Sequence, residues 1–181
     1  MARQVLRTKK YTALFITAFA SFITPFLGSS INVALPEIGD HFAMGAVTLS
    51  WVTTIYLLSA AVFLIPFGKL ADIYGRRKVF IYGVFVVSVS SLLAVFSPND
   101  VVFMILRVLQ GFGSAMIFGT AIAIITSVFP KKERGKAMGI NVAAVYIGLT
   151  MGPFVGGILT NQFGWESIFW SVAPVGFVVT L

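Results

Sequence analysis

The stretch GKLADIYGRRK, residues 68–78, is a short polar connection between two long apolar runs. The run before it covers about 49–67 and the run after it about 79–96. Each approaches the roughly 20 apolar residues that a membrane-spanning helix needs. The glycines within the connection allow a tight turn. This stretch therefore predicts two membrane-spanning helices that are joined closely at one surface of a bilayer.

Outward from this stretch, apolar runs and short polar connections alternate along the whole chain. Fifteen residues in the last run would cover roughly 22 Å, less than a hydrocarbon core about 30 Å thick. We therefore predict an all-α membrane protein in which 1–181 form one six-helix bundle, an inverted repeat of three plus three helices with the last helix truncated. The predicted spans are about 11–34, 49–67, 79–96, 101–129, 137–159 and 167–181, with turns at Pro36 and Gly39, Gly75, 97–100, Pro130 and Gly164.

Composition supports a membrane protein and argues against several classes of enzyme. The 181 residues are 58% hydrophobic and only 10% charged, whereas soluble domains average about 25% charged residues. The chain has no cysteine and a single histidine, His41, so neither a thiolate nor a histidine-based metal cluster is possible. No nucleophile–base set or phosphate-binding loop is present. We expect no enzymatic activity, no metal and no cofactor.

The positions of the charges predict how the chain is oriented. All thirteen Lys and Arg except Arg107 precede the first run or lie between runs two and three or runs four and five. The ionisable side chains in the alternate connections are only acidic residues and His41. By the positive-inside rule, the amino terminus lies in the cytoplasm and the protein in the cytoplasmic membrane. A nucleic-acid-binding face would not skip alternate loops, so we expect no nucleic-acid partner.

The stretch 68–78 resembles the signature loop of the major facilitator superfamily, G-x-L-a-D-x-x-G-R-[RK]-[RK]. That resemblance implies that Asp72 and Arg76 help to latch two transporter halves together, and that this chain is the amino-terminal half. A simpler interpretation of the three basic residues at 76–78 is an anchor to lipid phosphates. The latch residues that the resemblance singles out are Gly68, Asp72, Gly75, Arg76 and Arg77.

The fourth run contains an arginine, Arg107, roughly 10 Å below its outer end. A charged side chain at that depth is costly and marks a functional site, although it could also snorkel to the outer headgroups. The string 107–113, RVLQGFG, resembles the fourth-helix motif R-x-x-Q-G-x-G of the same superfamily. The resemblance implies that Arg107, with support from Gln110 and Gly111, takes part in proton or substrate coupling.

Three glycines, Gly148, Gly152 and Gly156, lie on one face of the fifth run and allow close helix packing. Helix packing alone is a sufficient reason for them. With Pro153 and Gly157 they also resemble the motif G-x-x-x-G-P-x-x-G-G of the antiporter branch, which implies export.

The end of the first run, NVALP from Asn32 to Pro36, resembles a string found in the fourteen-span drug:proton antiporters. Trp51 and Tyr56 match the W-x-x-x-x-Y pattern of that group. Members often carry an acidic residue five positions before the asparagine, where this chain has Leu27. No Asp or Glu lies at depth in the six runs, so a proton-carrying carboxylate is expected in the missing half.

These resemblances together imply proton-coupled efflux of lipophilic or cationic drugs. The expected partners are a small-molecule substrate, the proton, the lipid bilayer and a missing carboxyl-terminal half or a second copy of this chain. Two alternatives remain from the sequence. One is an uptake transporter of another branch, and the other is a non-transporting or dimerising half-transporter.

Overall fold

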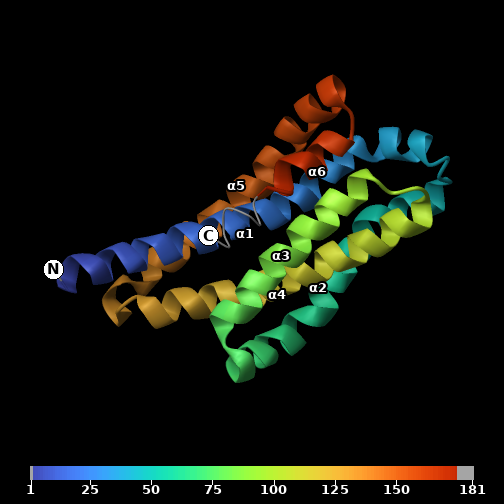
Figure 1. Cartoon of the computed structure of the whole chain (residues 1–181). Helices are drawn as coiled ribbons and strands as arrows, with labels where there is room; N and C mark the ends of the chain where they lie inside the picture. Colours follow the sequence, from blue (N-terminus) through green and yellow to red (C-terminus); the bar gives the residue numbers. More distant parts are fainter. Residues whose placement is uncertain (1, 175–181) are drawn as a thin grey trace.

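The computed structural model describes residues 2–174, with side chains from Lys10 onward. The described part contains six helices and no strand (Figure 1). The helices are α1 Ala2–His41, α2 Ala46–Tyr74, α3 Arg76–Val95, α4 Asp100–Val128, α5 Lys131–Phe163 and α6 Glu166–Val172.

Five of these helices, α1 to α5, are long and apolar enough to cross a membrane. This confirms the predicted all-helical membrane fold. Helix α6 begins at Glu166, and the predicted sixth span continues into 175–181, which lie outside the described residues.

The predicted turn at Pro36 and Gly39 is wrong. Helix α1 continues through both residues to His41. A proline inside a helix removes one backbone hydrogen bond and crowds the preceding turn. Here that cost is offset by packing, because Ala34 and Ile38 on either side of Pro36 are fully buried in the bundle.

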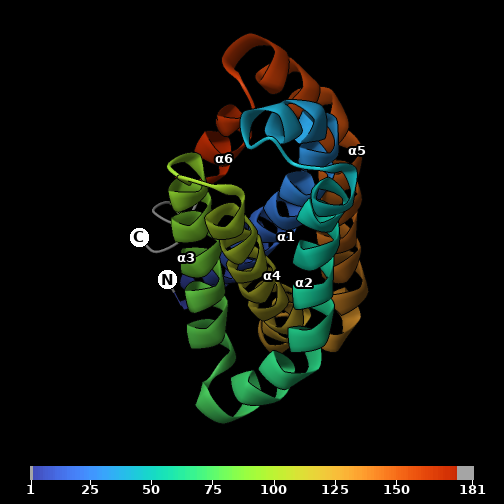
Figure 2. The same ribbon diagram turned by 90° about the vertical axis from the view of Figure 1, so that its right-hand side faces the viewer.

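The helices pair in a pattern that an inverted repeat produces. The most extensive contacts join α1 to α5, α2 to α4, and α3 to α4 (Figures 1 and 2). Exchanging the first three helices with the last three converts the α1–α5 pair into the α4–α2 pair. The two pairs are therefore equivalent positions of a three-plus-three arrangement.

Helices α2 and α5 have the most exposed apolar surfaces of the bundle. Only 17% of their most apolar windows is buried, against 50% for α3 and α4. Their outward faces carry large apolar side chains such as Leu57, Ile65, Ile147 and Phe154. A helix that stays apolar on its exposed side requires lipid or another protein segment as its surroundings.

Candidate functional site

Arg107 lies about two turns into α4 and is completely buried. Its Nε donates a hydrogen bond to the carbonyl oxygen of Val52 on α2 at 3.1 Å. Its Nη1 donates to Oε1 of Gln110, one turn further along α4, at 2.6 Å. The guanidinium therefore faces the interior of the bundle, and the snorkelling interpretation is wrong for this arrangement.

Gln110 and Ser114 extend this contact into a hydrogen-bond network across the bundle. Gln110 Nε2 donates to Ser91 Oγ on α3 at 3.3 Å. Ser114 Oγ donates to the Gln110 carbonyl and lies 3.0 Å from the Tyr56 hydroxyl on α2. The Tyr56 hydroxyl donates to the Thr24 carbonyl on α1 at 2.8 Å. Four helices thus meet around Arg107 through polar groups, which is costly in an apolar surrounding unless the groups are paired.

Gly111 allows α2 and α4 to approach closely beside this network. A Cβ at Gly111 would collide with the carbonyl oxygen of Tyr56 and lie 2.8 Å from the Cβ of Ser59. Ser59 Oγ on α2 donates a hydrogen bond to the Val108 carbonyl on α4 at 2.8 Å, which stabilises the contact between the two helices. The glycine therefore brings the backbone of α2, and with it Tyr56, against α4.

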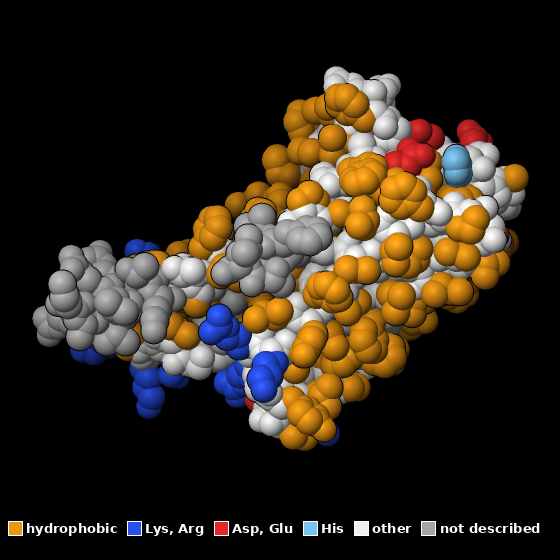
Figure 3. Space-filling model, viewed as in Figure 1, with side chains coloured by type: hydrophobic (Ala, Val, Ile, Leu, Met, Phe, Trp, Pro, Cys, Tyr) orange, Lys and Arg blue, Asp and Glu red, His pale blue; other side chains and the backbone are white. Residues whose placement is uncertain are grey.

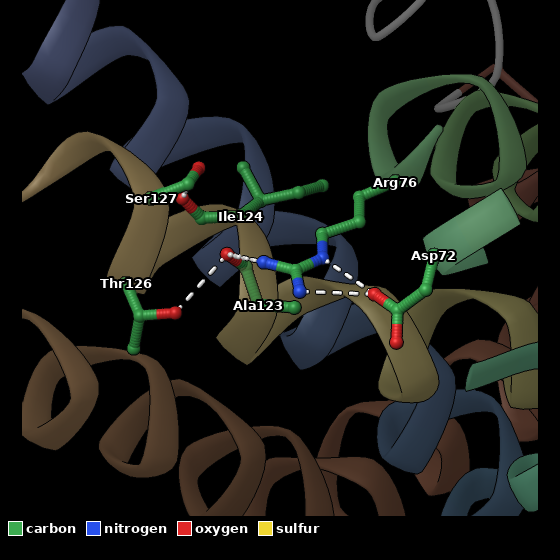
Figure 4. A network of polar contacts seen from close by, with 6 residues as sticks. All are labelled: Asp72, Arg76, Ala123, Ile124, Thr126 and Ser127. Atoms are coloured by element: carbon green, nitrogen blue, oxygen red, sulfur yellow. Dashed lines mark hydrogen bonds and ion pairs between the residues drawn. The ribbon is translucent and has the colours of Figure 1, made fainter. Parts of the chain in front are cut away.

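The predicted polar connection 68–78 is mostly helical, because α2 continues to Tyr74 and α3 begins at Arg76, so that Gly75 alone forms the turn. The latch residues around this turn hold an ion pair (Figure 4). Arg76 binds Oδ1 of Asp72 through Nε at 3.0 Å and Nη2 at 2.9 Å. Its Nη1 donates to the carbonyl of Ala123 near the end of α4 at 3.3 Å. Gly75 between them has φ +102°, a conformation that favours glycine. Asp72 remains 63% exposed in its side chain, and Arg77 is exposed as well.

The structure does not bring the latch loop and Arg107 together. Arg107 and Ala123 are sixteen residues apart on α4, which is about 24 Å along the helix axis. The two predicted sites lie toward opposite ends of the same helix, so any effect of one on the other passes through α4 or its neighbours.

The glycine face of α5 is covered by α1. A Cβ at Gly148 would collide with the carbonyl oxygen of Phe22, and one at Gly156 would lie 2.9 Å from the Cα of Ser30. Ser30 Oγ also donates to the Gly152 carbonyl at 3.0 Å. This glycine face is therefore not available for pairing with a second copy of the chain, because α1 covers it. Two other residues of the motif differ, since Pro153 is exposed and a Cβ at Gly157 would meet Val33 at an ordinary 3.5 Å.

The first-helix motif has a lateral contact to α2. Asn32 Oδ1 accepts a hydrogen bond from Thr53 Oγ1 at 2.9 Å in an exposed position. Leu27, five positions before Asn32, is fully buried in the apolar core.

Sequence patterns missed two contacts. Ser29 and Ser30 of α1, which meet the α5 glycines, carry no motif of their own. Lys10 forms an ion pair with Glu133 at the start of α5 and lies 4.8 Å above the Phe129 ring. These partners are more than a hundred positions apart in the chain, so local spacing holds no signal for them. Among the described residues no group of three His, Cys, Asp or Glu could hold a metal ion.

Comparison with known proteins places these motifs in context. The family model described as Major Facilitator Superfamily matches residues 17–181. Multidrug resistance protein Stp of Mycobacterium tuberculosis is 41% identical over 150 residues, 82% of this chain and 28% of that protein. Riboflavin transporter RibZ of Clostridioides difficile is 34% identical over 170 residues, 94% of this chain and 37% of that protein. Multidrug transporter protein MdtP of Bacillus subtilis is 32% identical over 180 residues, 99% of this chain and 32% of that protein. The chain thus spans well under half the length of these relatives.

Proposed function

The chain belongs to the major facilitator superfamily, whose members are membrane transporters and not enzymes, and we propose its function from this premise. We propose that the chain is the amino-terminal part of a proton-coupled exporter of lipophilic or cationic drugs. One observation carries the proposal. A completely buried arginine lies inside the bundle, where the Val52 carbonyl of α2 and the side chain of Gln110 on its own helix hold it. Charges at such depth are rare and mark substrate or ion pathways.

Export rather than uptake is supported by two features. Relatives that cover most of the chain are named as multidrug proteins. The α5 glycine pattern resembles that of the antiporter branch, and α1 and α5 are in close contact along it. In this proposal Gly148, Gly152, Pro153, Gly156 and Gly157 form an α1–α5 contact that tightens or loosens during transport.

The remaining motif residues receive roles in the same scheme. Arg107, Gln110 and Gly111 take part in coupling. Asp72 and Arg76, with Gly68, Gly75 and Arg77, latch the loop against the carboxyl-terminal half, and the exposed Asp72 carboxylate is available for that contact. Asn32 and Pro36 shape the outer end of α1.

We also propose the location and the missing parts. The protein lies in the cytoplasmic membrane with its amino terminus in the cytoplasm, as the alternation of basic connections supports. The described helices carry no Asp or Glu at depth, so the proton-carrying carboxylate belongs to the carboxyl-terminal half. The length of the relatives supports the existence of that half.

Efflux of a fluorescent cation tests the proposal. Cells that lack their own drug exporters and produce the full-length protein are loaded with ethidium, and its loss is followed after energy is supplied. We expect efflux that stops when an ionophore collapses the proton gradient, and that is absent in Arg107→Ala. Lys132→Ala, which removes an exposed cytoplasmic charge, is the matched control and should export normally. Ionophore-insensitive loss, or equal loss in Arg107→Ala, would contradict the proposal.

A second candidate follows from the relative named as a riboflavin transporter. The same cells are then supplied with radiolabelled riboflavin and not with ethidium. Riboflavin transport above that of vector-only cells, without ethidium efflux, would favour this candidate over drug export.

A further inference from the structure

The guanidinium of Arg107 lies against the ring of Tyr56. Its Cζ is 4.5 Å from the ring centroid, and both side chains are buried. A cation at this distance from an aromatic face is attracted by the electron density of the ring, and the attraction strengthens when water is excluded. The contact therefore supplies negative potential to a buried positive charge.

Arg107 has no acidic partner in the part of the chain that the structure describes. Its two hydrogen bonds go to neutral acceptors, a backbone carbonyl and the amide oxygen of Gln110. Both salt bridges found among the described residues involve other pairs, Lys10 with Glu133 and Arg76 with Asp72. The Nη2 atom of Arg107 is buried without a hydrogen-bond partner. A buried charge with only neutral partners depends heavily on each of them.

Two neighbouring helices, α1 and α4, hold the Tyr56 ring in place. Its hydroxyl bonds to the Thr24 carbonyl of α1 and lies beside Ser114 of α4. A Cβ at Gly28 of α1 would lie 3.0 Å from Cε1 of the ring, so that glycine leaves room for it. Gly111 brings the Tyr56 backbone against α4. With its edge, hydroxyl and backbone all fixed, the ring has little freedom to leave the guanidinium.

We infer that Tyr56 is a positioning residue for Arg107. The ring face of Tyr56 holds the buried guanidinium, and no carboxylate among the described residues does so. Gln110 and the Val52 carbonyl fix the direction of the guanidinium, and the ring stabilises its charge. The Nη2 atom receives no hydrogen-bond acceptor from the described residues.

Fluorination of the ring tests this inference, because fluorine withdraws electron density from the face while the shape changes little. Position 56 of the full-length protein is filled in turn with phenylalanine and with mono-, di- and trifluorophenylalanine. We expect ethidium efflux to fall with each added fluorine relative to Tyr56→Phe. The same series at Phe112 is the matched control and should be flat, because this ring contacts Phe63 and Phe67 and, in the described part of the chain, no cation. Equal slopes at the two positions would overturn the inference.

A second measurement needs no transported drug, which matters because the efflux readout rests on the proposed function. The melting temperature of the purified protein is measured for the position-56 series with Arg107 present and with Arg107→Met. We expect each fluorine to lower the melting temperature only when Arg107 is present, as a double-mutant cycle requires for a direct interaction. Arg107→Gln serves as a second neutral background if the Arg107→Met variant does not fold. If neither variant folds, the fluorine dependence at position 56 is compared with that at Phe112, and a dependence at position 56 alone supports the inference. Equal slopes with and without Arg107 would refute the role of Tyr56, whereas the expected cycle without any ethidium efflux would refute only the drug assignment.

Discussion

At the scale of single residues, Arg107 is the only fully buried charged side chain among those the structure describes. The sequence alone predicted its depth, because its distance from the start of the fourth run could be counted. The sequence could not predict the surroundings of the guanidinium, since the Val52 carbonyl that accepts a hydrogen bond from Nε is 55 positions away in the chain. Contacts of this kind come from helix packing, which local patterns do not encode.

The arginine-specific geometry of this site leads to the first prediction. Arg107→Ala should abolish transport while the protein still inserts, because the removed charge is not needed for the apolar helix to enter the membrane. Arg107→Lys should retain little activity, because an ammonium is a point charge that cannot reproduce the planar fork between Val52 and Gln110. Efflux rates, normalised to the protein present in the membrane fraction, measure both effects. Wild-type efflux in the lysine variant would show that charge alone is sufficient.

A second residue-scale prediction concerns the turn between α2 and α3. Gly75→Ala places a side chain at φ +102°, and strain of this kind costs of the order of 1–3 kcal/mol. Gly68→Ala is the control, because that glycine lies inside α2 and an added Cβ would meet nothing within 4 Å. Thermal unfolding in detergent should therefore show a lower melting temperature for the first variant and no loss for the second. A lower melting temperature in both would indicate that the motif glycines are needed for another reason.

At the scale of helices, hydrophobic runs predicted the elements well and their ends less well. A run of apolar residues identifies a spanning helix because lipid demands it, whereas a helix end depends on what packs around it. Helix α1 shows this at Pro36, where burial of Ala34 and Ile38 outweighs the usual effect of a proline. Likewise, the α5 glycines predicted a close contact, but only the structure identifies α1 as the helix that makes it.

The α1–α5 contact leads to a prediction about α5. Gly148→Ala should destabilise the bundle, because its Cβ would meet the backbone oxygen of Phe22, which cannot rotate away. Overpacking of this kind costs about 1–3 kcal/mol. Gly139→Ala on the same helix is the matched control, since an added Cβ there meets nothing within 4 Å. The melting temperatures of the two purified variants are compared, and that of Gly148→Ala should be the lower. Equal melting temperatures would mean that α1 and α5 separate easily.

At the scale of the whole molecule, charge is distributed unequally between the two ends of the bundle. On the face drawn in Figure 3, Lys and Arg gather toward the end that holds the α2–α3 connection, and His with several acidic side chains lies at the other end. Alternation of charge along the sequence predicted this separation, because the ends of successive spans fall on opposite sides of a bilayer. It could not predict which helix faces remain uncovered, and the structure shows that these faces lie on α2 and α5.

The charge separation predicts an orientation that a labelling experiment can measure. The 181 residues contain no cysteine, so a single cysteine introduced into this part reports one position once any others in the full-length protein are removed. Pro98→Cys lies in the connection between α3 and α4, and Lys132→Cys lies at the start of α5 among basic residues. Both positions are exposed in the structure. A membrane-impermeant maleimide should label Pro98→Cys in intact cells and Lys132→Cys only after the membrane is opened. The reverse result would place the basic connections outside the cell, and would overturn the proposed cytoplasmic amino terminus.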